Sequence, residues 1–369
     1  MRILVINPIV YTSETKNIVR ANSIKDTMIY DLCLAFHEQG HQVTLYAAEP
    51  YRPCCAEEYP FEIRWGKCIL QSICLPHRFP AMPEIKQYIK QNLDAIDLII
   101  TSEVFSINSL WAYRAAPEKT IVWHELAKHN AMMKRIPSKV WYKVVARLFM
   151  KDAYIIARSK SAWEFISGYC RNVSNQYIDH GVNLSKFPVS PDKENYFLVC
   201  SQLIQRKRVD GIISKFKAYL LQYDPGAKLY IAGSGDEECA LKDLTKQLDL
   251  ESKVVFCGKL THDELRNVMP KAKALLINTV KDNSMISIVE AIACGTPVVT
   301  TDVPLNSEYI QQYQLGIAKK EWDEKDLYEI EHNNNFYSGN CVKYREKLST
   351  QYRVEQFIEN YRNRPHGKS

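Results

Sequence analysis

Two carboxylates stand eight residues apart in the stretch KDNSMISIVEAIACGTPVV, residues 281–299. The uncharged run between Asp282 and Glu290 predicts a helix that ends before Gly295 and Pro297. Carboxylates so far apart on a helix cannot share one metal ion or one proton, but they can hold the two ends of an elongated ligand. The helix N-terminus between them favours phosphate. The pattern predicts a nucleotide-sugar site; the alternative is a capping Asp and a solvent-facing Glu.

The surrounding pattern places this stretch at the edge of a parallel sheet. Short β-rich runs alternate with longer helical patterns along the chain, which is typical of α/β proteins. The run ALLINT at 274–279 predicts a buried strand. We expect the helix over residues 284–294, with Asn283 or Ser284 as its N-cap. Asp282 would then lie beyond the carboxyl end of a strand, where ligands bind in such sheets.

The number of expected strands favours two doubly wound, Rossmann-like domains over one sheet. The strands are RILVIN, HQVTLYAA, DLIITS, TIVWHEL and AYIIARS in the first half and YFLVCS, KLYIAGS, KVVFCG, ALLINT and PVVTTD in the second. Residues 179–195 hold Gly, Pro and polar residues and divide the two sets. We therefore expect domains over residues 1–180 and 181–352 that face each other across a cleft.

The composition is that of a soluble globular protein. Of the 369 residues 46% are apolar and 24% are charged, and no stretch approaches the length of a membrane-spanning helix. The 11 cysteines are dispersed, which favours a reducing compartment, and no Cys-x-x-Cys pair or histidine cluster predicts a metal site. The N-terminal run MRILVINPIV predicts a first strand and not a signal peptide. We expect a cytoplasmic protein.

One segment accounts for most of the net charge of +6. Residues 128–151 carry seven Lys or Arg and no acid, interleaved with aromatic residues and Met. This pattern predicts peripheral contact with an anionic membrane, at its inner face. The alternative is a solvated basic helix whose apolar side joins the core. Nucleic acid is not an expected partner, because no recognised binding module accompanies the segment.

The opening stretch resembles the donor-site signature of family 4 glycosyltransferases, which are retaining enzymes of the GT-B fold. That signature has two acids separated by seven residues, and its second half, Glu-Ala-x-Ala-Cys-Gly-x-Pro-Val-Val, matches residues 290–299. Further family blocks follow in the expected order: WHEL at 123–126, DHGVNLSKF at 179–187, CSQLIQRKRVDGII at 200–213, LYIAGSGDEE at 229–238 and VVFCGKLTHDEL at 254–265. The closing QYRVEQFIENY resembles a helix that crosses back to the first domain, which residues 353–369 are expected to do.

The resemblance implies a metal-independent, hexosyltransferase-type enzyme whose co-substrate is a UDP or GDP sugar, with no further cofactor. It implies three catalytic residues: Lys207 on the diphosphate, Asp282 on the sugar and His124 beside the reacting bond. Glu290 would hold the ribose. The other expected donor-binding residues are Ser201, Gln202, Arg206, Lys259, Leu260, Asn283, Ser284, Met285 and Ile286.

Two departures from the family pattern concern the phosphate and the acceptor. Gln202 stands where the family has the arginine of its diphosphate pair, so a bidentate phosphate partner is lost unless Arg206 or Arg208 replaces it. The early glycine pair is replaced by NPIVYTSETKNIV. We expect a retaining glycosyltransferase that acts on a glycan or lipid-linked acceptor in cell-surface polysaccharide assembly. The alternatives are a non-catalytic nucleotide-sugar-binding partner of a transferase complex, and a GT-B epimerase or phosphorylase.

Overall fold

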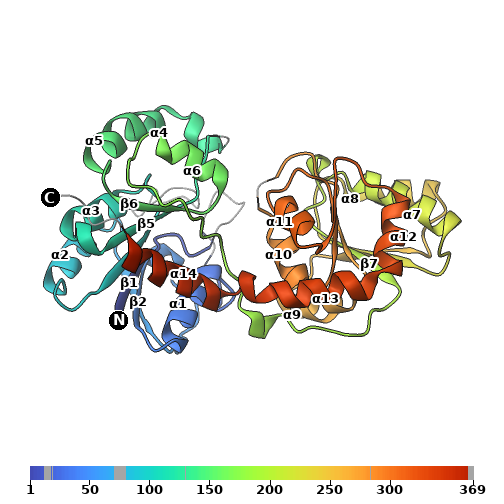
Figure 1. Ribbon diagram of the computed structural model, residues 1–369, viewed down its shortest axis with the longest axis horizontal. Helices are drawn as coiled ribbons and strands as arrows, with labels where there is room; N and C mark the ends of the chain where they lie inside the picture. Colours follow the sequence, from blue (N-terminus) through green and yellow to red (C-terminus); the bar gives the residue numbers. More distant parts are fainter. Residues whose placement is uncertain (12–17, 19, 70–79, 129, 283, 365–369) are drawn as a thin grey trace. The chain divides into compact units, whose positions relative to one another are not determined.

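The computed structural model describes residues 1–11, 18, 20–69, 80–128, 130–282 and 284–364. The chain forms two compact units, coloured by sequence in Figure 1. The N-terminal unit comprises Met1–Gly181 together with Thr350–Ser369, and the C-terminal unit comprises Val182–Ser349. Each unit has a hydrophobic core of its own around a parallel sheet.

The N-terminal unit contains a six-stranded parallel sheet in the order β3-β2-β1-β4-β5-β6. Its strands are β1 (Arg2–Ile6), β2 (Gln42–Ala48), β3 (Glu62–Gly66), β4 (Leu98–Ser102), β5 (Thr120–His124) and β6 (Tyr154–Ala157). Every residue of β4, β5 and β6 is buried. Parallel strands covered on both faces need such continuous apolar runs, which is why the sequence predicts them well.

The helices of this unit include one from the end of the chain. They are α1 (Met28–Glu38), α2 (Glu84–Gln91), α3 (Ile107–Ala115), α4 (Ile136–Val140), α5 (Arg147–Phe149), α6 (Lys160–Ser167) and α14 (Thr350–Asn363), and a π-helical turn, Trp141–Ala146, joins α4 to α5. Helix α14 places Val354 and Phe357 in the core of the unit, with Phe357 against Phe36 of α1.

The C-terminal unit repeats the same strand order, β12-β11-β10-β7-β8-β9, again all parallel. Its strands are β7 (Tyr196–Cys200), β8 (Lys228–Ala232), β9 (Val254–Gly258), β10 (Leu275–Leu276), β11 (Val298–Thr300) and β12 (Gly316–Ala318). Its helices are α7 (Val209–Gln222), α8 (Glu238–Gln247), α9 (His262–Val268), α10 (Ile286–Ala293), α11 (Ser307–Gln312), α12 (Glu324–His332) and α13 (Asn334–Tyr344).

The predicted α/β class with two Rossmann-like sheets is confirmed. All ten expected strands are present, although β10 is shorter than ALLINT suggested. Each sheet gains a sixth strand at its edge: EIRWG, which is half exposed, and the three-residue GIA. Neither has the long apolar run of a central strand. In the parts of the chain that the structure describes, every helix is too short or too polar to cross a membrane.

Candidate active site

The sheet of the C-terminal unit changes strand order between β7 and β10, which lie side by side. The loops that follow these two strands are joined by hydrogen bonds. The N–H of Val280 donates to the carbonyl of Arg206 at 3.0 Å, and the Thr279 hydroxyl oxygen lies 3.2 Å from the same carbonyl. Because ligands of open parallel sheets bind at this point, the joined loops form the first candidate site.

A charged cluster occupies these loops. One oxygen of Asp282 lies 2.7 Å from the ammonium of Lys207 and 2.7 Å from the Thr279 hydroxyl, and the other lies 2.8 Å from the guanidinium of Arg206. Burial raises the pKa of Asp282, but the hydrogen bonds from these partners outweigh it and lower the pKa below its ordinary value. Burial also lowers the pKa of Lys207, which Asp282 partly offsets. The cluster therefore holds two cations on one ionised carboxylate.

The backbone before α7 explains which arginine joins the cluster. Arg208 has a φ of 48°, in the left-handed region, and it separates the short helical turn Gln205–Lys207 from α7. Arg206 and Lys207 face Asp282, whereas the side chain of Arg208 is exposed. Of the two arginines that flank Lys207, only Arg206 contacts the carboxylate.

A glycine turn after β8 supports the loop that carries Ser201 and Gln202. A side chain at Gly233 would come within 1.9 Å of the Ser201 carbonyl, and one at Gly235 within 2.3 Å of the Leu203 carbonyl. The turn and the loop are also hydrogen-bonded, from the N–H of Leu203 to the carbonyl of Ser234 at 2.9 Å. Backbone packing therefore requires both glycines here. Ser201 is half-buried and Gln202 is exposed.

The N-terminus of α10 corrects one expectation. Ser284 is not its N-cap: the cap is Met285, whose N–H donates to the side-chain oxygen of Asn306 at 2.6 Å. The amide of Asn306 also donates to the Ser284 hydroxyl at 3.2 Å. Ile286, the first helical residue, is 47% exposed. Asn283 itself lies outside the described residues.

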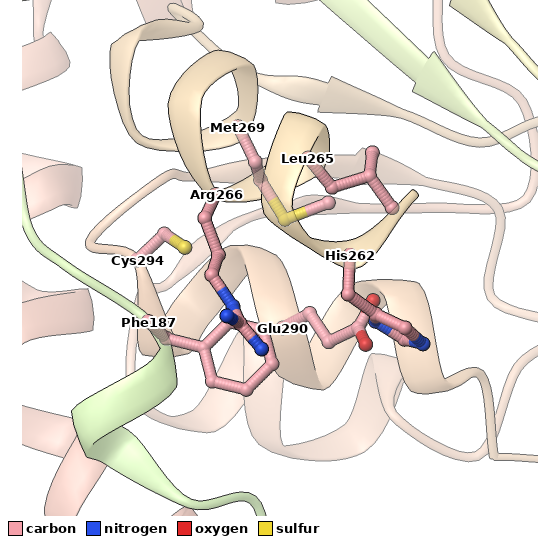
Figure 2. Close-up of a pocket in the computed structure, with 7 residues that line it drawn as sticks. All are labelled: Phe187, His262, Leu265, Arg266, Met269, Glu290 and Cys294. Carbon is pink, nitrogen blue, oxygen red and sulfur yellow. The ribbon is translucent and has the colours of Figure 1, made fainter. Parts of the chain in front are cut away.

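Glu290 lies farther along α10 in a small pocket (Figure 2). The other lining residues are Phe187, His262, Leu265, Arg266, Met269 and Cys294. Glu290 is 8% exposed, and burial raises its pKa to about 7, against the opposing charge of Arg266. A carboxylate that is largely removed from water favours a ligand that brings hydroxyl groups.

The turn between β9 and α9 leads into this pocket. It contains Lys259, which is exposed, and Leu260, which is half-buried against the core of the unit. Helix α9 then begins with a capping box between Thr261 and Glu264. His262 and Arg266, which line the Glu290 pocket, project from this helix (Figure 2).

The N-terminal unit places His124 as the last residue of β5 and buries it completely. Its Nδ1 lies 2.8 Å from a carboxylate oxygen of Glu103, but the contact is poorly aligned for a hydrogen bond. Glu103 follows the neighbouring strand β4, has a φ of 69°, and accepts a 2.6 Å hydrogen bond from the N–H of Glu125. The His124 ring lies against the rings of Tyr142 and Phe165.

A second charged group lies at the same sheet edge. Arg158, which follows β6, donates to Glu125 at 2.6 Å and to His180 at 2.7 Å, and its guanidinium covers the Trp123 ring at 3.7 Å. The charge of Arg158 holds the pKa of Glu125 well below its usual range. Arg158 is 8% exposed. This group joins the ends of β5 and β6.

Several residues of these sites are absent from the set expected from the sequence: Glu103, Thr279, Arg266 and Asn306. Glu103 had a usable signal, because it directly follows the strand run DLIITS. Thr279 is the last residue of ALLINT, so it also stands at a predicted strand end. Arg266 and Asn306 have no local signal, since they reach Glu290 and α10 from other elements. Among the described residues, no three His, Cys, Asp or Glu side chains group as metal ligands.

The comparison with known protein families separates the two units. Residues 183–351, nearly the whole C-terminal unit, match the family of glycosyl transferases group 1. This unit belongs to that family. The charged cluster and the Glu290 pocket both lie within the group 1 segment.

Two curated relatives of the chain illustrate the match. It is 26% identical over 191 residues to the O-antigen chain mannosyltransferase RfbU of Salmonella typhimurium, an alignment that covers 50% of the chain and 53% of the relative. It is 25% identical over 246 residues to the alpha-monoglucosyldiacylglycerol synthase of Streptococcus pneumoniae, covering 60% of the chain and 55% of the relative. The chain therefore matches about half the length of these relatives.

Solved structures extend the similarity to the whole chain. Anabaena Alr3699/HepE in complex with UDP superimposes with a TM-score of 0.64 at 15% identity, covering 98% of this chain and 99% of that one. At this identity the likeness shows the fold alone. The chain has the GT-B fold, as the sequence resemblance implied.

Proposed function

We propose that this protein is a retaining glycosyltransferase that transfers a hexose from a nucleoside-diphosphate sugar to a glycan or lipid-linked acceptor. The observation that carries the proposal is the pair of cations, Lys207 and Arg206, on Asp282 at the strand-order change of the sheet. Membership of the C-terminal unit in the group 1 family supports it. The C-terminal unit would be the donor domain and the N-terminal unit the acceptor side.

The two cations suit the leaving group of this reaction. When a sugar is transferred, negative charge develops on the departing diphosphate, and fixed positive groups stabilise it. Lys207 provides a point charge and Arg206 a planar fork that can bind two phosphate oxygens. In the proposal, Arg206 takes over the role of the family arginine that Gln202 replaces, and the first turn of α10, which begins at Ile286, adds backbone N–H groups. The transfer then needs no metal ion.

The remaining residues receive roles along the elongated donor. When the diphosphate binds Lys207 and Arg206, Asp282 would be released from these two cations and would accept hydrogen bonds from hydroxyl groups of the sugar. Glu290 would accept hydrogen bonds from the ribose hydroxyls in its pocket. Lys259 and Leu260 would lie beside the base, and His124 would contact the sugar. Further donor contacts are proposed for Ser201, Gln202, Asn283 and Ser284.

We propose that the acceptor attacks the donor sugar directly, without a protein nucleophile, and this determines the stereochemistry. The acceptor hydroxyl would attack from the face on which the diphosphate leaves, and the departing phosphate oxygen would accept its proton. The new bond then keeps the anomeric configuration of the donor. The anomeric proton coupling in the NMR spectrum of the product tests this directly.

The setting of the reaction is also proposed. Similarity to an O-antigen chain mannosyltransferase and to an alpha-monoglucosyldiacylglycerol synthase supports a role in cell-surface polysaccharide or glycolipid assembly. We propose that the protein works in the cytoplasm, at the inner face of the membrane, with UDP or GDP sugars as donors.

A transfer assay tests the proposal. Purified protein is incubated with radiolabelled UDP and GDP sugars and a membrane fraction as the acceptor source, and label in glycan or lipid is measured. Label should appear with one donor class, disappear in Lys207→Ala and persist in Lys246→Ala, which removes an exposed lysine of α8. Nucleotide binding without label transfer would favour a non-catalytic binding partner. A free epimerised nucleotide sugar would favour an epimerase. Either result would overturn the proposal.

A further inference from the structure

The helical stretch α4, Trp141–Ala146 and α5 of the N-terminal unit presents three parallel rows of side chains, each with a spacing of four residues. The buried row is Ser138, Tyr142, Ala146 and Met150. The apolar row, exposed by 76%, 53%, 44% and 62%, is Ile136, Val140, Val144 and Leu148. The basic row, also exposed, is Arg135, Lys139, Lys143 and Arg147.

The π-helical turn in the middle keeps these rows apart. In a regular α-helix of 3.6 residues per turn, side chains four residues apart drift slowly around the axis. A π-turn, with hydrogen bonds five residues apart, holds more residues per turn and reverses that drift. The apolar row therefore stays outside along the whole stretch and does not rotate into the core.

The buried row fixes the stretch rigidly to the unit. Tyr142, Ala146 and Met150 belong to a core cluster with residues of β5 and β6. The indole N–H of Trp141 donates to the carbonyl of Val104, next to Glu103, at 2.8 Å. The exposed rows are thus held on a fixed scaffold, and four large aliphatic side chains remain in water. Single exposed apolar residues are ordinary, but a contiguous row of them marks an interaction surface.

The charges around the apolar row define its partner. None of the four basic side chains forms an ion pair with a described residue. Arg114 of α3 adds a further cation at the far end, where its guanidinium lies 5.5 Å from the ring of Phe149, itself 47% exposed. A second copy of this surface would be repelled. Nucleic acid would gain little from an aliphatic row, since bases stack on aromatic side chains. An anionic phospholipid surface satisfies both rows at once.

We infer that the apolar row and the basic row form a membrane-docking surface specific for anionic phospholipid. The apolar row enters the boundary between headgroups and acyl chains, and the basic row contacts the lipid phosphates. The Tyr142 ring, on the buried face of the same stretch, lies 6.3 Å from the His124 ring. The docking surface is thereby fixed to the proposed acceptor side, although lipid binding itself does not depend on transferase activity.

Vesicle sedimentation of the full-length protein tests the inference. Vesicles of phosphatidylcholine alone are compared with vesicles of phosphatidylcholine and phosphatidylglycerol in equal parts. The basic-row variant is Arg135→Gln, Lys139→Gln, Lys143→Gln and Arg147→Gln; the apolar-row variant is Ile136→Ser, Val144→Ser and Leu148→Ser. A matched control removes four exposed lysines of the C-terminal unit: Lys246→Gln, Lys320→Gln, Lys325→Gln and Lys343→Gln.

The expected results separate the two rows. Wild-type protein and the control sediment with the anionic vesicles and stay in solution with the neutral ones. The basic-row variant loses binding on the order of several hundred-fold, because each cation near an anionic surface contributes about fivefold. The apolar-row variant binds only at low salt, since charge alone is screened by added salt. Unchanged thermal unfolding shows that both variants fold.

Three results would overturn the inference. One is equal sedimentation with neutral and anionic vesicles, and another is unchanged sedimentation of both row variants. The third is tight binding of a DNA duplex or an RNA hairpin with no vesicle binding, which would assign the surface to nucleic acid.

Discussion

The two sheets of this protein share one strand order but place different chemistry at the same point. In each, the first and fourth strands of the unit lie side by side, β1 with β4 and β7 with β10. In each, an acid follows the fourth strand: Glu103 after β4 and Asp282 after β10. Glu103 is 3% exposed and faces a histidine, whereas Asp282 is less enclosed and holds two cations.

The difference shows what topology determines and what it leaves to local sequence. A Rossmann-like sheet brings loops together at the strand-order change, whatever residues they carry. The pair of cations after β7 makes one edge suitable for an anionic ligand. The other edge closes over its acid with Tyr142 and Phe165 around His124. We therefore expect substitution of Asp282 to impair the ligand site and substitution of Glu103 to lower the stability of the fold.

The largest effect is expected for Lys207, one of the two cations on Asp282 in the C-terminal unit. Lys207→Ala should reduce sugar transfer by about 10²–10³-fold, the usual loss when one fixed donor to a developing anion is removed. The rate of transfer by each variant is compared with that of wild type at one fixed donor concentration. Arg206→Ala should fall in the same range, and Arg208→Ala should not, because its side chain is exposed. Equal losses of sugar transfer in Arg206→Ala and Arg208→Ala would contradict the assignment of Arg206 to the diphosphate.

The pH dependence of stability sharpens the comparison within the C-terminal unit. The pKa of Glu290 is raised from 4.5 to about 7, so its ionisation favours the unfolded chain. This penalty is absent below pH 4.5 and grows as the pH rises towards 7. Glu290→Gln should therefore be more stable than wild type at pH 8, by about 3 kcal/mol, and the gap should close near pH 4.5. Urea unfolding across this range measures it; a constant gap would contradict the assignment.

The acid of the N-terminal edge is expected to matter for folding. Glu103→Gln weakens its contacts with the Glu125 N–H and His124, and should lower the free energy of unfolding by about 1–3 kcal/mol. Asp282→Asn should cost less, because that site is more open to water. Denaturant unfolding of both variants gives the comparison. A larger loss of stability in Asp282→Asn than in Glu103→Gln would contradict this prediction.

The smallest effect is expected at the backbone turn before α7. Arg208 has a φ of 48°, where glycine is not strained, but glycine also gains freedom in the unfolded chain. Arg208→Gly should therefore change the free energy of unfolding by less than about 1 kcal/mol and leave nucleotide binding intact. Calorimetric unfolding and titration with nucleotide check both points. Loss of nucleotide binding in Arg208→Gly would show that Arg208 contacts the nucleotide directly, which its exposed side chain does not suggest.

The sequence predicts the strands and α10 well because each has a strong local cause. Buried parallel strands need continuous apolar runs, and the Cys-Gly-Thr-Pro after Ala293 ends the helix. The strand-end positions of His124 and Asp282 follow from the same runs. Edge strands β3 and β12 were missed because they are short and partly exposed.

The partners of the candidate site residues were harder to predict, since they come from distant segments. The side chain of Asn306 accepts from the N-cap residue of α10 from 21 residues away, so the local choice of Ser284 was wrong. Whether Arg206 or Arg208 faces Asp282 depends on a single left-handed residue, which sequence does not reveal. Arg266 approaches Glu290 from another helix.

The most direct test of the central claim is a thermal-shift measurement of the purified protein with UDP, GDP and their common sugar conjugates, repeated with Lys207→Ala. Saturating nucleotide stabilises the folded protein by mass action. We predict a rise in Tm with one nucleotide class that is abolished in Lys207→Ala, while the unliganded variant still unfolds cooperatively. The same rise in the variant, or no shift with any nucleotide, would contradict a diphosphate site at Lys207, Arg206 and Asp282.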